Sequence, residues 1–259
     1  MKTALITGAS NGIGLELAKI HASKGGNLVL VARNKQKLDE LKLELEEKHK
    51  IQVYVIEKDL SLLNAAKEVY EETKAQNIKI DFLINNAGFG DFGFFYETDW
   101  QKESQMINLN ITALTEFTKL YLQDMIKNKS GKIMNVASTA AFQPGPTMAV
   151  YYATKAYVLS FSEAINNELE DKGITVTALC PGATESGFQD AAAMNESKLV
   201  KGKKLPSSKE VAEFGYQAML NGKTVAIHGF LNKFLVNLVR FLPRKMVVKA
   251  TRKVQDKAN

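Results

Sequence analysis

Short apolar runs alternate with longer amphipathic stretches along almost the whole chain. The runs hold Val, Ile, Leu and Ala at nearly every position, which is typical of parallel strands buried on both faces of a sheet. We therefore predict strands at Thr3–Thr7, Leu28–Ala32, Gln52–Ile56, Phe82–Asn85, Lys132–Val136, Thr175–Leu179 and Thr224–Ile227.

Helical periodicity fills the intervals between these runs. Thr98 with Gln101, and Ser207 with Glu210, have the spacing of capping boxes and mark two helix starts. The regular alternation of strand and helix predicts an α/β fold, a doubly wound parallel sheet with right-handed crossovers. The predicted helices are Gly12–Ser23, Lys35–Lys48, Leu62–Gln76, Trp100–Lys127, Tyr151–Glu170 and Lys209–Leu220.

No repeat, low-complexity stretch or Pro/Gly/Ser-rich linker divides the 259 residues. We expect one domain over residues 1–229 and a helical C-terminal extension over residues 230–259. Three interpretations of this extension stay open: it packs on the domain or on a second subunit, it covers the substrate pocket, or it lies on an anionic membrane surface as basic amphipathic helices do. Its apolar stripe consists of Phe230, Leu231, Phe234, Leu235, Leu238, Val239 and Leu242.

The net charge of +6 is concentrated in this extension. From Phe230 onward there are eight basic residues and one acidic residue, Asp256, which leaves the preceding chain with a net charge of −1. A weakly acidic body argues against nucleic-acid binding. The single cysteine, Cys180, permits no internal disulfide, and the three histidines lack metal-ligand spacing. We therefore expect no metal site. Because the N-terminal apolar run is too short for a signal peptide, we also expect a cytoplasmic protein.

A tyrosine and a lysine four residues apart open one of the predicted helices. Tyr151 and Lys155 therefore share a helix face, and Ser138 follows a predicted strand at the sheet edge where ligands bind. A cation about 4 Å from a tyrosinate stabilises it by roughly 4 kcal/mol. We predict that Lys155 lowers the pKa of Tyr151 for general acid–base catalysis, while Ser138 hydrogen-bonds the reacting oxygen. The alternative is an ordinary amphipathic helix with a buried tyrosine and a solvated lysine.

A glycine-rich turn joins the first predicted strand to the first predicted helix. Its glycines allow a phosphate to approach the backbone, and the helix N-terminus offers free N–H groups and a positive dipole end. The turn therefore predicts a dinucleotide site. The expected contacts come from Gly8, Ser10, Asn11, Gly12, Ile13 and Gly14.

The end of the second predicted strand indicates which dinucleotide is preferred. NAD-preferring sites place Asp or Glu here to hold the ribose 2′-hydroxyl. This chain instead has Ala32 followed by Arg33, with Lys35 and Lys37 nearby. A 2′-phosphate would find a cation and no repelling carboxylate, so the sequence predicts NADP.

Two polar segments follow later strands and are expected at the same cofactor. Asp59 and Leu60 are candidates for the adenine, where Asp59 can accept a hydrogen bond from the amino group. A plain helix-capping role for this segment is the alternative. Asn86, Ala87 and Gly88 are expected to brace the cofactor side of the central sheet.

The motifs, taken in order, resemble those of the classical short-chain dehydrogenase/reductase family over about Lys2 to Ile227. They are Thr7-Gly8-x-x-x-Gly12-x-Gly14, Asn85-Asn86-Ala87-Gly88, Ser138, Tyr151-x-x-x-Lys155 and Pro181-Gly182. The resemblance implies a Rossmann-type sheet of seven strands, a nicotinamide cofactor and a Ser-Tyr-Lys centre. It also implies a homodimer or homotetramer.

The resemblance assigns roles to further residues. Asn110 would complete a proton relay through Lys155, with Asn108 as the nearby competitor. Tyr151 and Lys155 would also contact the cofactor, where Lys155 would hold the nicotinamide ribose. After Pro181 and Gly182 the family carries a threonine that contacts the nicotinamide amide. Thr184 and Ser186 share that neighbourhood here, and the choice between them stays open. Residues 187–204, with Phe188, Met194, Lys198, Lys201, Lys203 and Lys204, would form the substrate lid.

Aromatic and apolar residues gather where the substrate would enter. If they line the cleft, the substrate is hydrophobic. We predict an NADP(H)-dependent carbonyl reductase or alcohol dehydrogenase; the alternatives are a 3-oxoacyl thioester reductase and a non-catalytic NADP-binding sensor or scaffold. The candidate lining residues are Phe89, Phe92, Phe94, Phe95, Tyr96, Phe142, Met148 and Phe188.

Overall fold

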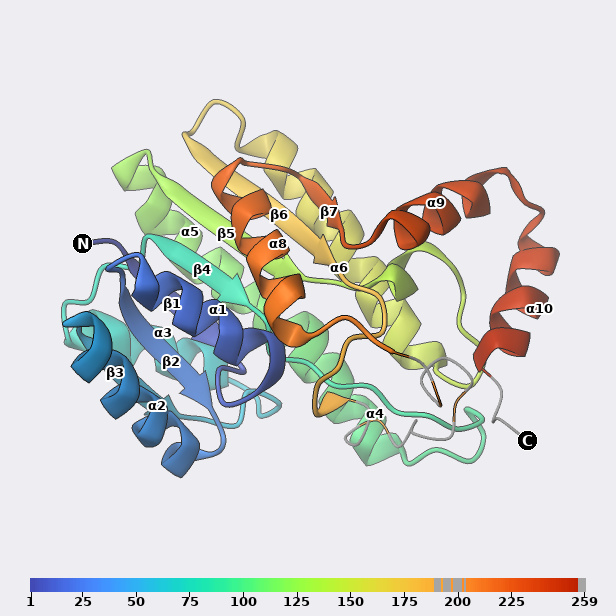
Figure 1. Cartoon of the computed structure of the whole chain (residues 1–259), viewed down its shortest axis with the longest axis horizontal. Helices are drawn as coiled ribbons and strands as arrows, with labels where there is room; N and C mark the ends of the chain where they lie inside the picture. The colour runs from blue at the N-terminus through green and yellow to red at the C-terminus, as the bar shows by residue number, and fades with distance from the viewer. Residues whose placement is uncertain (189–191, 193–196, 198–201, 203, 256–259) are drawn as a thin grey trace.

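The structure is a computed structural model that describes residues 1–188, 192, 197, 202 and 204–255. Within these residues, seven parallel strands form one sheet in the order β3-β2-β1-β4-β5-β6-β7 (Figure 1). Each boundary lies within one residue of its predicted position, so the predicted sheet is confirmed. The strands are β1 Thr3–Thr7, β2 Asn27–Ala32, β3 Val53–Glu57, β4 Phe82–Asn85, β5 Gly131–Val136, β6 Ile174–Cys180 and β7 Val225–Ile227.

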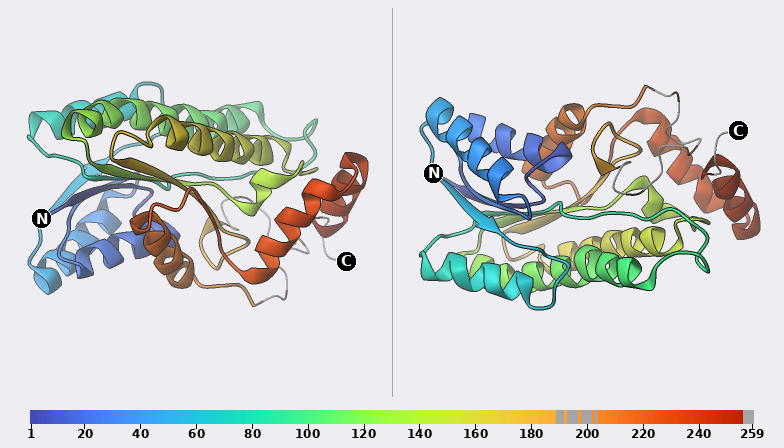
Figure 2. Two further views of the ribbon diagram at one scale, coloured as in Figure 1. Left: turned by 90° about the horizontal axis from the view of Figure 1, so that it is seen from above. Right: turned by 90° about the horizontal axis from the view of Figure 1, so that it is seen from below.

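Helices cover both faces of the sheet (Figure 2). The α-helices of the described residues are α1 Gly12–Ser23, α2 Lys35–His49, α3 Ala65–Ala75, α4 Trp100–Ile107, α5 Leu114–Asn128, α6 Ala149–Glu168, α8 Ser208–Leu220, α9 Phe230–Leu238 and α10 Arg244–Gln255. Successive strand residues point to opposite faces. Ile6 therefore packs with Leu17 of α1, whereas Leu5 packs with Phe117 of α5. Both faces of β1 are buried, which explains why its sequence is apolar at every interior position.

The strand order places a reversal point between β1 and β4, which are neighbours in the sheet although two strands separate them in sequence. At such a point the connections after the two strands diverge toward opposite faces and leave a crevice at the carboxyl edge. Gly8 follows β1 and Asn86 follows β4. Ser138 and Pro181, after β5 and β6, lie along the same edge. The topology thus brings these four segments to one side of the molecule.

The long helix predicted at Trp100–Lys127 is interrupted in the structure. Its middle, Asn108–Ala113, is π-helical and separates α4 from α5. The wider turn sets Asn110 where its side chain bonds the backbone of Phe89 and the hydroxyl of Thr154. Nothing in the local sequence signals this change, because the partners lie on other segments.

The two predicted capping boxes have different outcomes. At α8 the Ser207 hydroxyl accepts the N–H of Glu210, and the Glu210 carboxylate accepts the N–H of Ser207, as predicted. At α4 the prediction is wrong. Asp99 is the N-cap and accepts the N–H of Gln101, while the Thr98 hydroxyl donates to Glu103. A carboxylate one residue later in the chain takes the capping position there.

The C-terminal extension forms α9, a short 3₁₀ turn at Val239–Phe241 and α10. These helices lie at one end of the molecule, opposite the β3 edge of the sheet (Figures 1 and 2). Val236 of α9 and Val247 of α10 are buried. Over the described residues, none of the helices has the length and apolar character that crossing a membrane requires.

Candidate active site

One cavity of about 960 Å³ runs along the carboxyl edge of the sheet. Its first end is formed by the turn between β1 and α1, where Gly8 and Gly12 adopt positive φ angles of 68° and 54°. Asn11 begins α1 without a side-chain capping hydrogen bond, so the first N–H groups of the helix remain available. Asn86 holds the turn in place, because its amide donates to the carbonyl groups of Thr7 and Gly8 at 2.9 and 3.2 Å.

The close packing of the turn between β1 and α1 explains why its third glycine, Gly14, has no side chain. A Cβ added at Gly14 would lie 2.3 Å from the carbonyl oxygen of Gly8 and 2.4 Å from the Asn86 amide nitrogen. Both contacts are too short for any side chain. Gly14 therefore allows α1 to approach the β1 turn, and the cavity borders Ser10, Asn11, Gly12 and Ile13 directly.

Positive charge collects where β2 leads into α2. Arg33 and Lys37 line the cavity, whereas Lys35 turns away and pairs with Asp39 at 2.6 Å. The Arg33 guanidinium is 77% exposed and lies 4.0 Å from a carboxylate oxygen of Asp59. The expectation that no carboxylate lies near Arg33 is therefore wrong, because the chain after β3 returns beside the end of β2.

Asp59 itself is fixed by the residue two positions later. The N–H and hydroxyl of Ser61 donate to its Oδ1 at 2.9 and 2.7 Å. Partial burial raises the pKa of Asp59, but these hydrogen bonds and the charge of Arg33 outweigh burial and hold the pKa below its ordinary value. Asp59 is therefore a carboxylate at neutral pH, and the predicted adenine contact would have to use it as an acceptor. Both Asp59 and Leu60 line the cavity.

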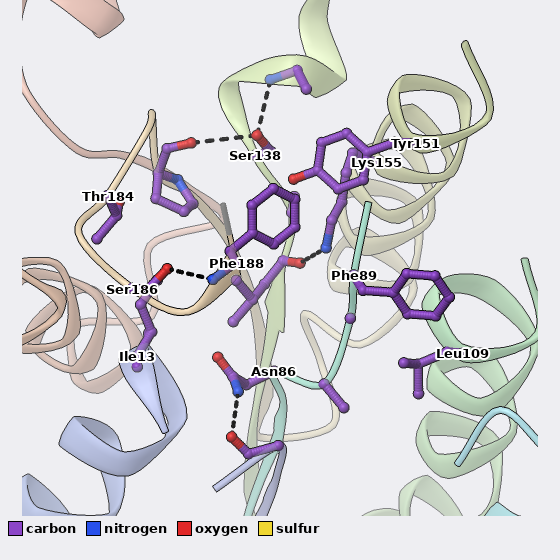
Figure 3. A pocket seen from close by; sticks show the side chains of 18 of the residues that line it. Ile13, Asn86, Phe89, Leu109, Ser138, Tyr151, Lys155, Thr184, Ser186 and Phe188 are labelled. Atoms are coloured by element: carbon purple, nitrogen blue, oxygen red, sulfur yellow. Dashed lines mark hydrogen bonds between the residues drawn. The ribbon is translucent and has the colours of Figure 1, made fainter. Parts of the chain in front are cut away.

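Ser138, Tyr151 and Lys155 meet in the middle of the cavity (Figure 3). Ser138 begins a 3₁₀ turn after β5, where its hydroxyl accepts the N–H of Ala140 at 3.1 Å and donates weakly to the Pro181 carbonyl at 3.4 Å. Tyr151 and Lys155 lie on one face of α6, as their spacing predicts. The Lys155 ammonium lies 5.8 Å from the centroid of the Tyr151 ring and donates to the Val136 carbonyl at 2.7 Å.

The ionisation of the pair differs from the sequence-based expectation. Burial raises the pKa of the Tyr151 phenol to about 12, and the hydrogen bond to Ser138 lowers it only in part. Burial also lowers the pKa of the Lys155 ammonium to about 8. The prediction of a lowered Tyr151 pKa is wrong for this structure, because desolvation raises that pKa and also lowers the pKa of Lys155, whose ammonium donates to the Val136 carbonyl. Tyr151 is consequently a neutral phenol at physiological pH, able to donate a proton.

Asn110 lies behind Ser138, Tyr151 and Lys155 rather than in the cavity wall. Its amide donates to the Phe89 carbonyl and to the Thr154 hydroxyl, both at 3.0 Å, and its oxygen accepts the Phe89 N–H at 3.2 Å. A Cβ at Gly88 would lie 3.0 Å from the Asn110 oxygen and 3.4 Å from the Lys155 nitrogen, so the three residues are in close proximity. Asn108 does not line the cavity. The proton-relay role of Asn110 stays a prediction.

Both candidates for the amide contact border the cavity (Figure 3). The Thr184 hydroxyl donates to the Gly182 carbonyl at 3.0 Å, which folds it back on its own loop. The Ser186 hydroxyl accepts the N–H of Phe188 at 3.3 Å, and its Cβ lies opposite Gly12. Pro181 and Gly182 line the cavity as well, and the choice between the two hydroxyls stays open.

The apolar end of the cavity contains only some of the predicted aromatic residues. Phe89, Met148 and Phe188 line it. Phe142 packs instead beside the buried core around Val158, and Phe95 and Tyr96 are exposed. Of the remaining candidates, Phe92 packs beside Tyr151 and Tyr152, and Phe94 stacks on Tyr96 with ring centroids 5.4 Å apart. The predicted lid residues Met194, Lys198, Lys201 and Lys203 lie outside the described residues.

The C-terminal extension contributes much of this apolar wall. The sequence left its position open, and the structure places one side of α9 and the last turns of α10 at the cavity. Gln255 donates from its amide nitrogen to the Tyr152 hydroxyl at 2.5 Å, which joins α10 to α6. The sequence did contain one signal for this placement. Val236, which is buried in the structure, is apolar although it lies on the side of α9 opposite the apolar stripe. The lining residues are Asn232, Leu235, Val236, Val239, Ala250, Thr251, Val254 and Gln255.

Comparison with known proteins assigns this arrangement to a family. The family model for short chain dehydrogenases matches residues 2–197. The chain belongs to the short-chain dehydrogenase family. This confirms the resemblance drawn from the motifs, and the seven-stranded sheet with flanking helices is the fold of that family.

Individual relatives are about one-third identical to this chain over the aligned residues. The very-long-chain 3-oxoacyl-CoA reductase of Anas platyrhynchos is 33% identical over 184 residues, which cover 69% of this chain and 58% of that protein. A solved short-chain dehydrogenase from Sphingobium yanoikuyae in complex with NADPH is 30% identical, with a TM-score of 0.83 over 93% of this chain and 94% of its own. The bulky-bulky ketone specific alcohol dehydrogenase from Comamonas testosteroni is 32% identical, with a TM-score of 0.79 over 93% and 92% of the two chains.

The matched curated reductase is longer, since this chain spans 58% of its length. The family consists of oxidoreductases that bind a nicotinamide cofactor. The residues of the β1 turn fit the phosphates of such a cofactor, because two glycines with positive φ and the uncapped N-terminus of α1 face the cavity. Arg33 and Lys37 would lie at its ribose end.

Proposed function

We propose that this protein is an NADP(H)-dependent oxidoreductase that interconverts a carbonyl group and a secondary alcohol on a hydrophobic substrate. The observation that carries the proposal is the meeting of Ser138, Tyr151 and Lys155 in one cavity between the glycine turn and an apolar wall. A pure nucleotide-binding protein would need the turn but not a buried phenol beside a buried ammonium. The arrangement therefore favours catalysis over sensing.

The side chains of the trio have complementary tasks in carbonyl reduction. When bound, the nicotinamide supplies the hydride to the carbonyl carbon. The Ser138 hydroxyl donates to the carbonyl oxygen and orients it. The Tyr151 phenol, which is protonated at neutral pH because burial raises its pKa to about 12, gives its proton to that oxygen as negative charge develops there. The Lys155 ammonium, 5.8 Å from the ring centroid, then stabilises the tyrosinate.

The apolar wall supports a hydrophobic substrate. Phe89, Met148 and Phe188 come from the body of the domain, and Leu235 and Val254 come from α9 and α10. Burying such surface favours binding by about 25 cal/mol per Å². The names of two of these relatives give very-long-chain 3-oxoacyl-CoA and bulky-bulky ketones as their substrates. A 3-oxoacyl thioester reductase is accordingly the second candidate.

The test is oxidation of NADPH by the full chain with a panel of carbonyl compounds. The panel covers small diketones, aromatic aldehydes, steroid ketones and 3-oxoacyl thioesters. We expect turnover that rises with the apolar surface of the substrate. Preference for thioesters would select the second candidate. Tight NADPH binding without turnover of any compound would contradict the proposal and favour a non-catalytic sensor.

Arg33 supports the choice of NADP. Replacing it by alanine removes the cation nearest the expected 2′-phosphate, and a charge-assisted hydrogen bond contributes roughly 1.5–3 kcal/mol. We therefore expect Arg33→Ala to raise the KM for NADPH about tenfold or more and to leave the KM for NADH unchanged. Steady-state kinetics with each nucleotide measures both values.

The matched control for Arg33 is Lys35→Ala. Lys35 begins the same helix, but it pairs with Asp39 and does not line the cavity. Its replacement should leave the KM for NADPH unchanged. Equal effects of Arg33→Ala on NADPH and NADH would show that Arg33 does not recognise the phosphate, and a preference of the wild-type protein for NADH would overturn the cofactor assignment.

A further inference from the structure

Nine of the eighteen exposed large apolar side chains in the described part of the chain lie within residues 230–254. Two of them, Leu235 and Val254, line the cavity. The other seven do not, and we call them the apolar tail face. They are Phe230, Leu231, Phe234, Leu238, Phe241, Leu242 and Met246.

The apolar tail face is not needed to hold α9 on the domain. Phe230, Phe234 and Leu238 recur every four residues and so share one side of α9, with exposed fractions of 90%, 56% and 40%. Val236, with an exposed fraction of 4%, is buried on the other side of α9. A helix that is apolar on both sides has a second surface to cover. An exposed cluster of this kind marks an interaction site in a folded protein.

The charge around this face is of one sign. Residues 230–255 contain no acidic residue. Their seven basic residues are all exposed: Lys233, Arg240, Arg244, Lys245, Lys249, Arg252 and Lys253. A second copy of this chain bound symmetrically would bring these cations against the same cations, which disfavours self-association through this face. An anionic partner with an apolar interior matches both properties.

We propose that the apolar tail face docks on the surface of an anionic lipid bilayer, with α9 and α10 lying in the interface. Phenylalanine and leucine side chains enter the boundary between headgroups and acyl chains, and the lysines and arginines contact lipid phosphates. Both helices lie at one end of the molecule (Figure 2).

The docked orientation has a consequence for the cavity. Leu235 of α9 and Val254 of α10 line its apolar end, while other residues of the same helices form the docking surface. Docking would therefore bring the apolar end of the cavity close to the bilayer. The docking proposal itself rests on exposure and charge, and it holds whether or not the protein is a carbonyl reductase.

The first test is sedimentation of the full chain with lipid vesicles. We expect binding to vesicles of phosphatidylcholine mixed with phosphatidylglycerol, and at least tenfold weaker binding to phosphatidylcholine alone. Raising NaCl to about 1 M, where the Debye length is about 3 Å, should release most of the bound protein. Wild-type protein that stays in the supernatant with the mixed vesicles would overturn the proposal, as would binding that neither lipid charge nor salt alters.

Two variants separate the apolar and the electrostatic contributions. Phe230→Ser combined with Phe234→Ser, and Lys245→Gln combined with Lys249→Gln, should each lower the partition coefficient about tenfold or more. The matched controls are Leu43→Ser with Ile126→Ser and Lys48→Gln with Lys127→Gln, which replace exposed residues of α2 and α5. The controls should bind like the wild type. Circular dichroism and urea midpoints confirm that all variants fold.

The same variants test the alternative that a second copy of this chain covers the apolar tail face. Light scattering gives the mass of the wild-type protein and of the phenylalanine variant in solution. We expect equal masses. A smaller mass for the variant, together with no vesicle binding by the wild type, would show that the apolar tail face is a subunit interface and that the proposal is wrong.

Discussion

The Tyr151→Phe variant is expected to lose about 10³-fold in kcat for carbonyl reduction while its KM for NADPH stays within a factor of about two. The substitution removes one hydroxyl, and positioned general acids contribute roughly 10²–10⁴-fold to rate. The ring itself remains, packed at 5.3 Å from Phe188 and 6.1 Å from Tyr152 between centroids. The proposed cofactor contacts at the β1 turn and at Arg33 do not involve this hydroxyl, so we expect cofactor binding to change little.

The control for this prediction is Tyr157→Phe. Tyr157 lies on the same helix, its hydroxyl contacts Thr115 at 3.1 Å, and it does not line the cavity. It should retain wild-type kcat. Full activity of Tyr151→Phe would show that the proton comes from another group. A parallel rise in the KM for NADPH would show instead that the phenol binds the cofactor.

The Lys155→Met variant is expected to lose most of its activity and yet to be more stable than the wild type at pH 7. Lys155 is 5% exposed, and burial lowers its pKa from an ordinary value of 10.5 to about 8. That shift corresponds to a cost of about 3 kcal/mol for carrying the charge in the folded state. Loss of the hydrogen bond to Val136 offsets part of the gain, since a charged hydrogen bond contributes roughly 1.5–3 kcal/mol. We expect a net increase of about 1 kcal/mol in the free energy of unfolding, and a fall in kcat of about 10²-fold or more.

The pH dependence of this difference identifies its origin. The folded pKa of Lys155, about 8, lies below its unfolded value of 10.5. Below pH 8 both states carry the proton and the full cost is present. Between pH 8 and 10.5 only the unfolded state keeps the proton, so wild-type stability gains with pH relative to the variant. The stability advantage of Lys155→Met should therefore shrink, and then reverse, over this window.

Urea unfolding of both proteins at several pH values measures the effect. Tyrosines with raised pKa values, such as Tyr121, influence both proteins equally, so the difference isolates Lys155. Lys119→Met on the exposed side of α5 is the control and should change stability little at any pH. A Lys155→Met variant that is less stable at pH 7, with no change in the difference across the window, would show that the buried ammonium is net stabilising.

Much of the fold was predictable because its signals are local. Parallel strands covered on both faces are apolar at successive positions, as β1 and β2 are, and such runs place the strand boundaries to within one residue. The β1 turn was predictable for the same reason, since Gly8 and Gly12 adopt backbone conformations that other residues rarely take. The shared face of Tyr151 and Lys155 follows from helix geometry alone.

Other features depend on contacts between segments that are distant in sequence. The π-helical stretch around Asn110 forms against Phe89 and Thr154, and the ion pair of Arg33 with Asp59 joins the ends of two strands. Local periodicity could not identify the partners of Asn110 or of Arg33. The same holds for the C-terminal extension, whose apolar residues divide between the cavity and the surface only once α9 and α10 are placed on the domain.

The sequence by itself determined the sheet, the dinucleotide turn and the presence of serine, tyrosine and lysine at the carboxyl edge, because these follow from composition, spacing and strand order. Only the tertiary structure decided the ionisation of that trio. A pKa depends on how much solvent is removed and on which atoms replace it, and for Tyr151 and Lys155 those atoms come from Ser138, Val136 and the cavity walls. Spacing along a helix places two groups together, but the surrounding segments decide which of them carries the proton.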